Sequence, residues 1–172
     1  MVTLTKAIEE LKHTPVGIQD LKKLVPPQCK VVKLAELKGK HRRQVFGGGV
    51  RALIVLLPSK VSKVGHYITL IGRTHHIEYF SSLGNSMERE SKLLHSDQGI
   101  LKQLLGANYI YNRTRLQGGA FKIRTCAMFC VARCFLSDLK LREFVPLFTN
   151  RVSLTTPDDI VSIMNFLTFQ DV

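Results

Sequence analysis

Hydrophobic and polar positions follow a helical period over several long segments of the chain. Residues 1–24 have the pattern of amphipathic helix, with Thr14-Pro15 as a helix-start signal and Pro26-Pro27 as the stop. Residues 87–105 also have a helical period, with an interruption near Asp97. Further helices are predicted over residues 126–136, from residue 138 to about residue 148, and from residue 156 onward.

Short apolar runs bounded by turn residues predict strands between these helices. The predicted strands are residues 51–57, 67–71, 76–81 and 108–112, with a hairpin turn over residues 72–75. Strands interspersed with helices in this order predict an α+β fold, a small mixed sheet flanked by helices. No repeat, low-complexity tract or linker divides the sequence, so we expect a single domain over residues 1–172.

Composition narrows the classes of protein to consider. The 172 residues are 45% apolar with a mean hydropathy of +0.05, which is enough to bury a core. No apolar run reaches the length of a membrane span, and the amphipathic start does not resemble a secretion signal, so we expect neither membrane insertion nor secretion. Three of the four cysteines crowd one predicted helix at a spacing of four, which does not suit a disulfide framework and favours a reducing compartment.

Charge adds a second signal, because 25 Lys and Arg against 13 Asp and Glu give a formal net charge of +12. Such a surface attracts polyanions. Few aromatic residues interleave with the basic ones, which favours contact with a duplex backbone over stacking on single strands. A solvated surface kept for solubility is an equally good interpretation. The candidate DNA contacts come from the densest basic run and are Lys38, Lys40, Arg42 and Arg43.

Three residues carry the side chains that thiol hydrolysis of an amide requires. Thiol attack needs a thiolate, and an adjacent imidazole provides it by taking the proton and later returning it to the leaving amine. His66 is the candidate base and Cys126 the candidate nucleophile, while the Gln117 amide is a candidate donor to the oxyanion. Thr125 is a good N-cap, so Cys126 lies in the first turn of its predicted helix, where free N–H groups and the helix dipole favour the thiolate.

Two other features fit a structural interpretation better than a chemical one. Cys130 and Cys134 share the apolar stripe of the Cys126 helix, and we interpret them as small buried hydrophobes. His75 and His76 are adjacent on a predicted strand and therefore point to opposite faces, so we predict no metal site there.

The motifs around the candidate trio resemble the adenain-like cysteine proteases, a group that includes the adenovirus maturation protease and its relatives in Polinton elements and virophages. The resemblance covers about residues 50 to 137. It rests on Gly65-His66-Tyr67 before an apolar strand, Tyr79-Phe80-Ser81-Ser82-Leu83-Gly84, Asn108-Tyr-Ile-Tyr-Asn112 with Leu116-Gln117, and Thr125-Cys126 before an apolar helix. It implies a protease fold of the adenain and ubiquitin-like-protease type, with His66, Ser81, Gln117 and Cys126 at the catalytic centre.

The chain departs from this family at three points. Ser81 stands where the family usually has Asp, Asn or Glu to orient the histidine, so the site is either a triad completed by a hydroxyl or a Cys-His dyad. Glu78 is the nearest carboxylate, but strand alternation turns it to the opposite face from Ser81. Ala127 replaces the usual glycine after the cysteine, and the stretch between Gln117 and Cys126 is slightly longer than usual.

The resemblance implies a viral or mobile-element endopeptidase that matures virion precursor proteins by cutting near glycine, in the virion and in the host nucleus or cytoplasm. We expect a monomer whose chemistry needs no cofactor, with DNA and a substrate-derived peptide as candidate activators. Two alternatives use the same sequence features. One is a deconjugating enzyme that removes ubiquitin-like modifiers, and the other is a degenerate protease fold that serves as a basic DNA-binding virion protein.

Overall fold

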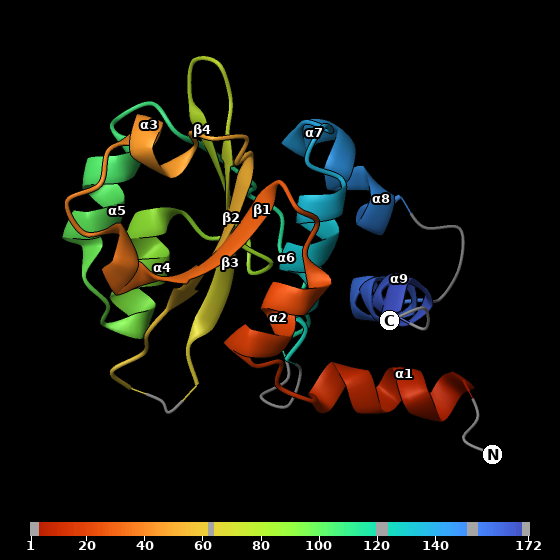
Figure 1. The fold of residues 1–172 in the computed structure, drawn as a ribbon. Helices are drawn as coiled ribbons and strands as arrows, with labels where there is room; N and C mark the ends of the chain where they lie inside the picture. Colours follow the sequence, from red (N-terminus) through yellow and green to blue (C-terminus); the bar gives the residue numbers. More distant parts are fainter. Residues whose placement is uncertain (1–3, 62–63, 120–123, 151–154, 170–172) are drawn as a thin grey trace.

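The computed structural model describes residues 4–61, 64–119, 124–150 and 155–169. Within these residues, five strands form one sheet in the order β1-β2-β3-β4-β5 (Figure 1). β1 and β2 are parallel, β2, β3 and β4 are antiparallel neighbours, and β4 and β5 are parallel, so the sheet is mixed. The strands are β1 (Cys29–Lys33), β2 (Ala52–Leu57), β3 (His66–Gly72), β4 (Ile77–Phe80) and β5 (Ile110–Tyr111).

Strand register brings the candidate site to one end of the sheet. Leu57, the last residue of β2, pairs with His66, the first residue of β3. Thr69 pairs with Phe80 at the end of β4, so the chain leaves the sheet at Ser81, beside the side of β3 that carries His66. Antiparallel pairing therefore places two segments that are 15 residues apart next to each other.

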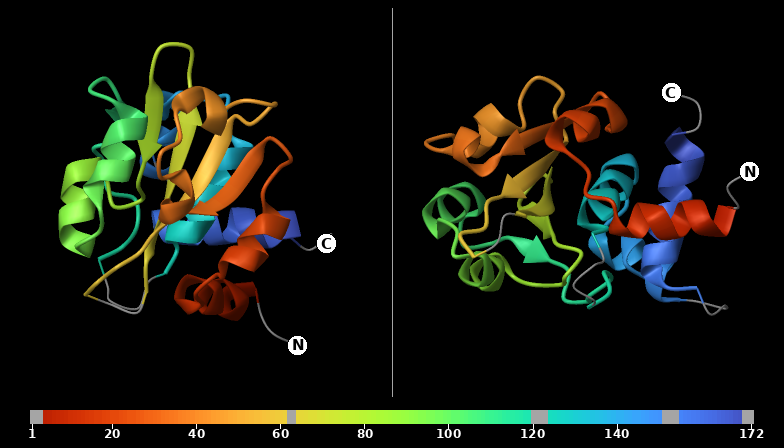
Figure 2. Two further views of the ribbon diagram at one scale, coloured as in Figure 1. Left: turned by 60° about the vertical axis from the view of Figure 1, so that its left-hand side comes forward. Right: turned by 90° about the horizontal axis from the view of Figure 1, so that it is seen from below.

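One face of the sheet is covered by short helices from two parts of the chain. Leucines and valines from β2 and β3 pack against apolar side chains of these helices, and this cluster is one of three that form the core. The covering elements are η1 (Leu34–Leu37), α3 (Arg42–Val45), α4 (Met87–Leu94) and α5 (Gln98–Leu105). They lie to one side of the strands when the molecule is viewed end-on (Figure 2).

The other face is covered by α6 (Cys126–Phe135), which is apolar around most of its circumference and packs against β2 and β3. A helix that is hydrophobic on all sides must be buried on all sides. The sheet and α2 (Ile18–Leu24) cover α6 on one side, while an outer layer covers it on the other. That layer contains α1 (Leu4–His13), α7 (Leu141–Phe144), α8 (Pro146–Thr149) and α9 (Pro157–Phe169).

The predicted α+β class with a mixed sheet between helices is confirmed. The hairpin over residues 72–75 and the interruption between α4 and α5 are also confirmed, because His95–Asp97 separate the two helices. In the part of the chain that the structure describes, no helix is long and apolar enough to cross a membrane.

Several predicted boundaries were wrong. Thr14-Pro15 does not start a helix, because α2 begins only at Ile18, and β1 was not predicted at all. The helix predicted over residues 138–148 is instead the pair of short helices α7 and α8, with Pro146 at the first position of the second. The strand predicted over residues 108–112 shortens to two residues.

Candidate functional site

The contact between α6 and β3 brings the predicted base and the predicted nucleophile together. His66 begins β3 and is 6% exposed, while Cys126 begins α6 and is half-buried, and the two side chains are close enough for each to shift the pKa of the other. Gly65, just before His66, allows the start of β3 to approach the end of β2, because a Cβ there would lie 2.5 Å from the Leu57 carbonyl oxygen. The Gly-His pair of the sequence motif therefore has a steric reason.

The two groups shift each other toward a thiolate and an imidazolium. Burial raises the pKa of the Cys126 thiol, but the hydrogen bond and charge of His66 outweigh burial and lower that pKa overall, aided by the backbone N–H groups of Tyr67 and Ala127. Burial likewise lowers the pKa of His66, but the bond and charge of Cys126 and the charge of Glu90 raise it overall. An activated thiol is the result.

A hydroxyl and a carboxylate stand behind His66. Its Nε2 lies 3.1 Å from Ser81 Oγ, and that hydroxyl donates to Glu90 Oε2 at 2.7 Å. Because Ser81 donates to Glu90, it accepts from the histidine, so Nε2 carries a hydrogen and Nδ1 faces the thiol. Glu90 Oε1 is 3.6 Å from the same Nε2, and Glu90 is 1% exposed. The serine thus links the imidazole to a buried negative charge.

Sequence reasoning missed Glu90, which lies in the first half of α4. Its signal in the sequence is weak: a Ser86 N-cap starts a helix shortly after the strand that ends beside Ser81. Glu78 is not the partner, as expected from strand alternation, since it binds Arg73 and Arg133 at 2.9 and 2.6 Å instead. The carboxylate that is absent at position 81 is therefore supplied from a neighbouring helix.

Asn112 holds the backbone of Ser81 in place. Its Oδ1 accepts from the Ser81 N–H at 3.0 Å, and its Nδ2 donates to the Ser81 carbonyl at 2.7 Å. Asn112 follows β5 and is 4% exposed. The Asn112 amide thus bonds the Ser81 N–H and carbonyl as a neighbouring strand would. These bonds fix the backbone just beyond the end of β4 and keep the Ser81 hydroxyl directed toward His66.

Gln117 is held by the residue after Ser81. The N–H groups of Leu116 and Gln117 both donate to the Ser82 carbonyl, at 2.8 and 2.9 Å. The Ser82 hydroxyl donates to Gln117 Oε1 at 2.8 Å, which fixes Nε2 as the donor end of the amide. The loop that carries the predicted oxyanion donor is thereby attached to the segment that carries Ser81.

Thr125 occupies the N-cap position of α6, as predicted, but its side chain does not cap the helix. The hydroxyl donates to Asp158 Oδ1 in α9 instead. First-turn N–H groups of α6 are left for other acceptors, and the Ala127 N–H is directed to the Cys126 sulfur. The Thr125–Asp158 bond, which joins α6 to α9, therefore takes the place of the predicted capping bond.

The remaining cysteines on α6 are structural. Cys130 and Cys134 are fully buried, and burial raises the pKa of Cys130 well above its ordinary value. Cys29 on β1 is also buried and forms no disulfide. The prediction of a buried stripe is confirmed for Cys130 and Cys134, and the helix contains one activated thiol and two inert ones.

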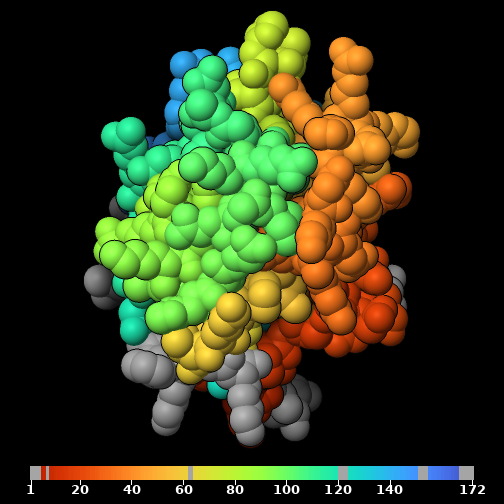
Figure 3. All heavy atoms as spheres, turned by 90° about the vertical axis from the view of Figure 1, so that its left-hand side faces the viewer, coloured from red at the N-terminus to blue at the C-terminus, as the bar shows by residue number. Residues whose placement is uncertain are grey.

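The four candidate DNA contacts lie on the chain between η1 and the end of α3. Lys38, Lys40 and Arg43 are exposed, while Arg42 is half-buried and donates to the His76 carbonyl at 3.2 Å. Arg42 and Arg43 line a groove of about 640 Å³ together with Arg51 and Arg73. Lys38 and Lys40 do not line this groove. Figure 3 shows the orange segment beside α5 on the surface.

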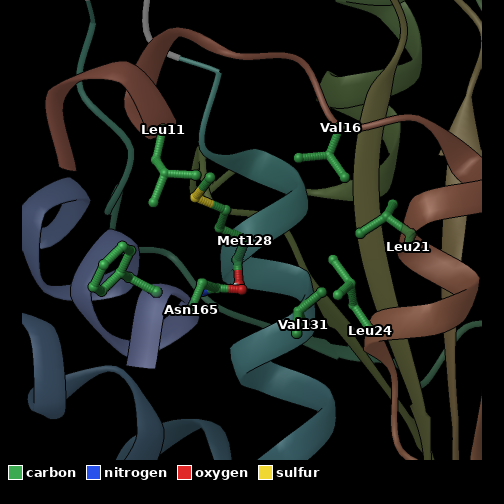
Figure 4. A pocket seen from close by; sticks show the side chains of 8 residues that line it. Leu11, Val16, Leu21, Leu24, Met128, Val131 and Asn165 are labelled. Carbon is green, nitrogen blue, oxygen red and sulfur yellow. The ribbon is translucent and has the colours of Figure 1, made fainter. Parts of the chain in front are cut away.

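A separate pocket lies among α1, α2, α6 and α9. It has a volume of about 340 Å³ and is lined by apolar side chains of α1, α2, α6 and α9, with Asn165 as the polar exception (Figure 4). It includes neither His66 nor Cys126. Among the described residues, no group of three His, Cys, Asp or Glu side chains is arranged to hold a metal ion.

No protein-family model matches the chain, and no curated protein matches it. Similar solved structures include the central domain of the uncharacterized Lpg1148 protein from Legionella pneumophila, at 14% identity and a TM-score of 0.48. That alignment covers 89% of this chain and 96% of that chain. A likeness this distant leaves the chemistry of the site to its own residues.

Proposed function

We propose that this protein is a cysteine endopeptidase with Cys126 as nucleophile and His66 as general base. The observation that carries the proposal is that Cys126 interacts with His66 while hydrogen bonds connect His66 through Ser81 to Glu90. A nucleophile bonded to a base, and a base oriented by a third group, is the arrangement that activates a weak nucleophile.

In this mechanism the Cys126 thiolate attacks the carbonyl carbon of a peptide bond, and a C–S bond forms while the carbonyl oxygen becomes an oxyanion. Gln117 Nε2 and a backbone N–H of the first turn of α6 stabilise that oxyanion. The His66 imidazolium gives its proton to the leaving amine as the C–N bond breaks. Water, deprotonated by His66, then cleaves the thioester and restores the thiol.

Ser81 and Glu90 keep His66 competent through both steps. Ser81 holds the Nε2 hydrogen, which leaves Nδ1 to exchange a proton with the thiol. The buried Glu90 charge favours the imidazolium that forms when the thiolate is generated. Ser81 is thus an orienting group, and the electrostatic part belongs to Glu90.

The proposed substrates are protein segments cut near glycine, and virion precursor proteins of a viral or mobile element are the proposed source. A deconjugating enzyme would use the same catalytic residues. Cleavage of a Gly-Gly peptide and of a ubiquitin-like modifier linked to a fluorophore, compared on the same enzyme, separates the two. The degenerate-protease alternative rested on the missing carboxylate, and Glu90 weakens it.

The test is the rate of alkylation of each cysteine by iodoacetamide as a function of pH, read by mass spectrometry. Because the pKa of Cys126 is lowered, its alkylation should persist below the pH range of an ordinary thiol and fall only as pH drops through the lowered value. His66→Ala removes the charge that compensates the burial of Cys126, so the pKa of its thiol should rise. We expect its alkylation at neutral pH to fall roughly tenfold or more and to recover only in alkaline solution.

Peptide hydrolysis should also be lost above an upper pH limit, because the leaving amine needs the imidazolium proton. The raised pKa of His66 moves that limit upward, so the active range lies between the apparent pKa values of the Cys126–His66 pair. Cys126→Ala should abolish hydrolysis. If Cys126 reacts no faster than Cys29 and His66→Ala changes nothing, the catalytic proposal is rejected.

A second activity, binding of duplex DNA, is favoured by the groove in which four arginines meet. Ion pairs with Asp138 and Glu78 engage Arg51 and Arg73, while Arg43 has no partner among the described residues and is exposed. Guanidinium groups that line an open groove suit phosphate oxygens. DNA is proposed here as a polyanionic partner rather than as a substrate.

A further inference from the structure

Asp158 is a buried carboxylate that connects two segments of the candidate site, the one that carries Gln117 and the one that leads into Cys126. It lies at the second position of α9, is 3% exposed, and is 32 residues beyond Cys126 in the chain. A buried carboxylate is costly unless donors compensate it. The donors that surround this one come from both sides of the candidate site.

Each carboxylate oxygen accepts from a different segment. Oδ2 accepts from the Gly118 N–H at 2.8 Å, and Oδ1 accepts from the Thr125 hydroxyl. Gly118 directly follows Gln117, and Thr125 directly precedes Cys126. One side chain therefore fixes the oxyanion loop and the start of the nucleophile helix relative to each other.

The neighbouring carboxylate, Asp159, has other partners. The Lys12 ammonium pairs with Asp159 at 2.5 Å, and the Lys12 carbonyl accepts from the Arg124 N–H at 2.7 Å. The Asp159 carboxylate also accepts from the Thr156 N–H at 2.7 Å, and the Lys12–Arg124 bond joins backbone atoms, so neither contact of Asp159 reaches the site segments. Asp158 reaches the site segments directly, whereas Asp159 faces α1.

We propose that Asp158 is a positioning residue that sets the distance between the Gln117 amide and the Cys126 thiol. The inference rests on the proposed function, because the distance matters only if both groups act on one carbonyl. An oxyanion donor is effective only where the oxyanion will form, so a displaced Gln117 stabilises the transition state less while the thiol keeps its activation by His66.

The test compares Asp158→Asn with Asp159→Asn, a control that removes the same charge one residue away. Asparagine retains one acceptor oxygen, so Asp158→Asn loses one of the two bonds and keeps the shape. We expect kcat for a glycine-containing peptide to fall roughly tenfold to a hundredfold with little change in KM. Alkylation of Cys126 by iodoacetamide, which forms no oxyanion, should change less than about twofold. Asp159→Asn should leave both rates near those of the unmodified protein.

Thr125→Val provides a second variant if Asp158→Asn fails to fold by thermal unfolding. It removes only the Thr125 donor and should show the same split between hydrolysis and alkylation. Hydrolysis that falls no more in Asp158→Asn than in Asp159→Asn would overturn the inference, as would an equal loss of hydrolysis and alkylation in a folded variant. Absence of both activities in the unmodified protein would reject the proposed function itself, and the role of Asp158 with it.

Discussion

At the residue scale, the site differs from a simple triad because a hydroxyl stands between the imidazole and the carboxylate. Ser81 accepts from His66 and donates to Glu90, and Glu90 Oε1 still lies 3.6 Å from the imidazole nitrogen. Because Glu90 is 1% exposed, solvent screens its charge little at that separation, and the charge helps to raise the pKa of His66. Orientation and electrostatic support, which one aspartate combines elsewhere, are divided here between two residues.

Glu90→Gln should therefore reduce hydrolysis without removing the nucleophile. Glutamine keeps an acceptor for the Ser81 hydroxyl but removes the charge that helps to raise the pKa of His66. We expect kcat/KM to fall roughly tenfold to a hundredfold and the alkaline limit of activity to move to lower pH. Steady-state hydrolysis of a peptide across pH measures both effects.

Glu88→Gln is the matched control, because Glu88 lies on the same helix and bonds Tyr109 at 2.7 Å, away from His66. Its pH profile should be that of the unmodified protein. Equal effects of the two substitutions would mean that Glu90 acts through the stability of α4 and not through His66.

The sequence was sufficient to predict candidate site residues that lie next to a recognisable strand or helix. His66 precedes an apolar strand and Cys126 starts an unbroken apolar helix, so both candidates could be placed from the sequence. Glu90 could not, because its role depends on how α4 packs back onto the end of β4. Nor could Asp158, because local sequence does not specify where α9 meets α6.

At the element scale, α6 is fixed at both ends. Its first turn carries Cys126, and near its last turn the fully buried Arg133 bonds Glu78 of β4 at 2.6 Å. The same guanidinium donates to the Leu139 carbonyl at 2.7 Å and lies over the Phe144 ring. A buried ion pair of this kind fixes the position of the helix against the sheet and so contributes to where the thiol lies.

Glu78→Ala should destabilise the protein strongly, because it leaves the Arg133 charge buried without its partner. We expect the free energy of unfolding to fall by about 3–5 kcal/mol in urea denaturation. Asp138→Ala breaks the ion pair between Asp138 and Arg51, whose side chains are respectively 85% and 61% exposed. We expect it to lower the free energy of unfolding by less than about 1 kcal/mol. Similar losses for the two variants would contradict the assignment of the Glu78 pair as the anchor of α6.

The elements that sequence patterns missed are those that tertiary contacts define. β1 carries Lys30 and Lys33 at the edge of the sheet, where charged side chains are common, so its residues look like a basic loop. Pro146 divides the predicted helix of residues 138–148, because proline starts a new helix more easily than it continues one. Long apolar helices and buried central strands were predicted well, since burial alone determines their pattern.

At the scale of the whole molecule, the candidate active site and the basic groove lie at opposite ends of β3. His66 begins this strand, while Gly72 ends it and lines the groove with Arg73. At about 3.3 Å per residue the strand separates them by roughly 20 Å. A polyanion bound in the groove would therefore not occupy the position of the scissile bond, and DNA binding and hydrolysis can be tested as independent properties.

The double variant Arg42→Ala/Arg43→Ala should weaken duplex DNA binding while the alkylation rate of Cys126 stays unchanged. If each guanidinium neutralises one phosphate, the slope of log K against log salt concentration should fall by about 1.8. Fluorescence anisotropy of a labelled duplex over a salt series measures that slope. Lys22→Ala/Lys23→Ala removes the same charge from exposed positions on α2, on the other face of the sheet, so equal slope changes in the two variants would assign binding to net charge and reject the groove.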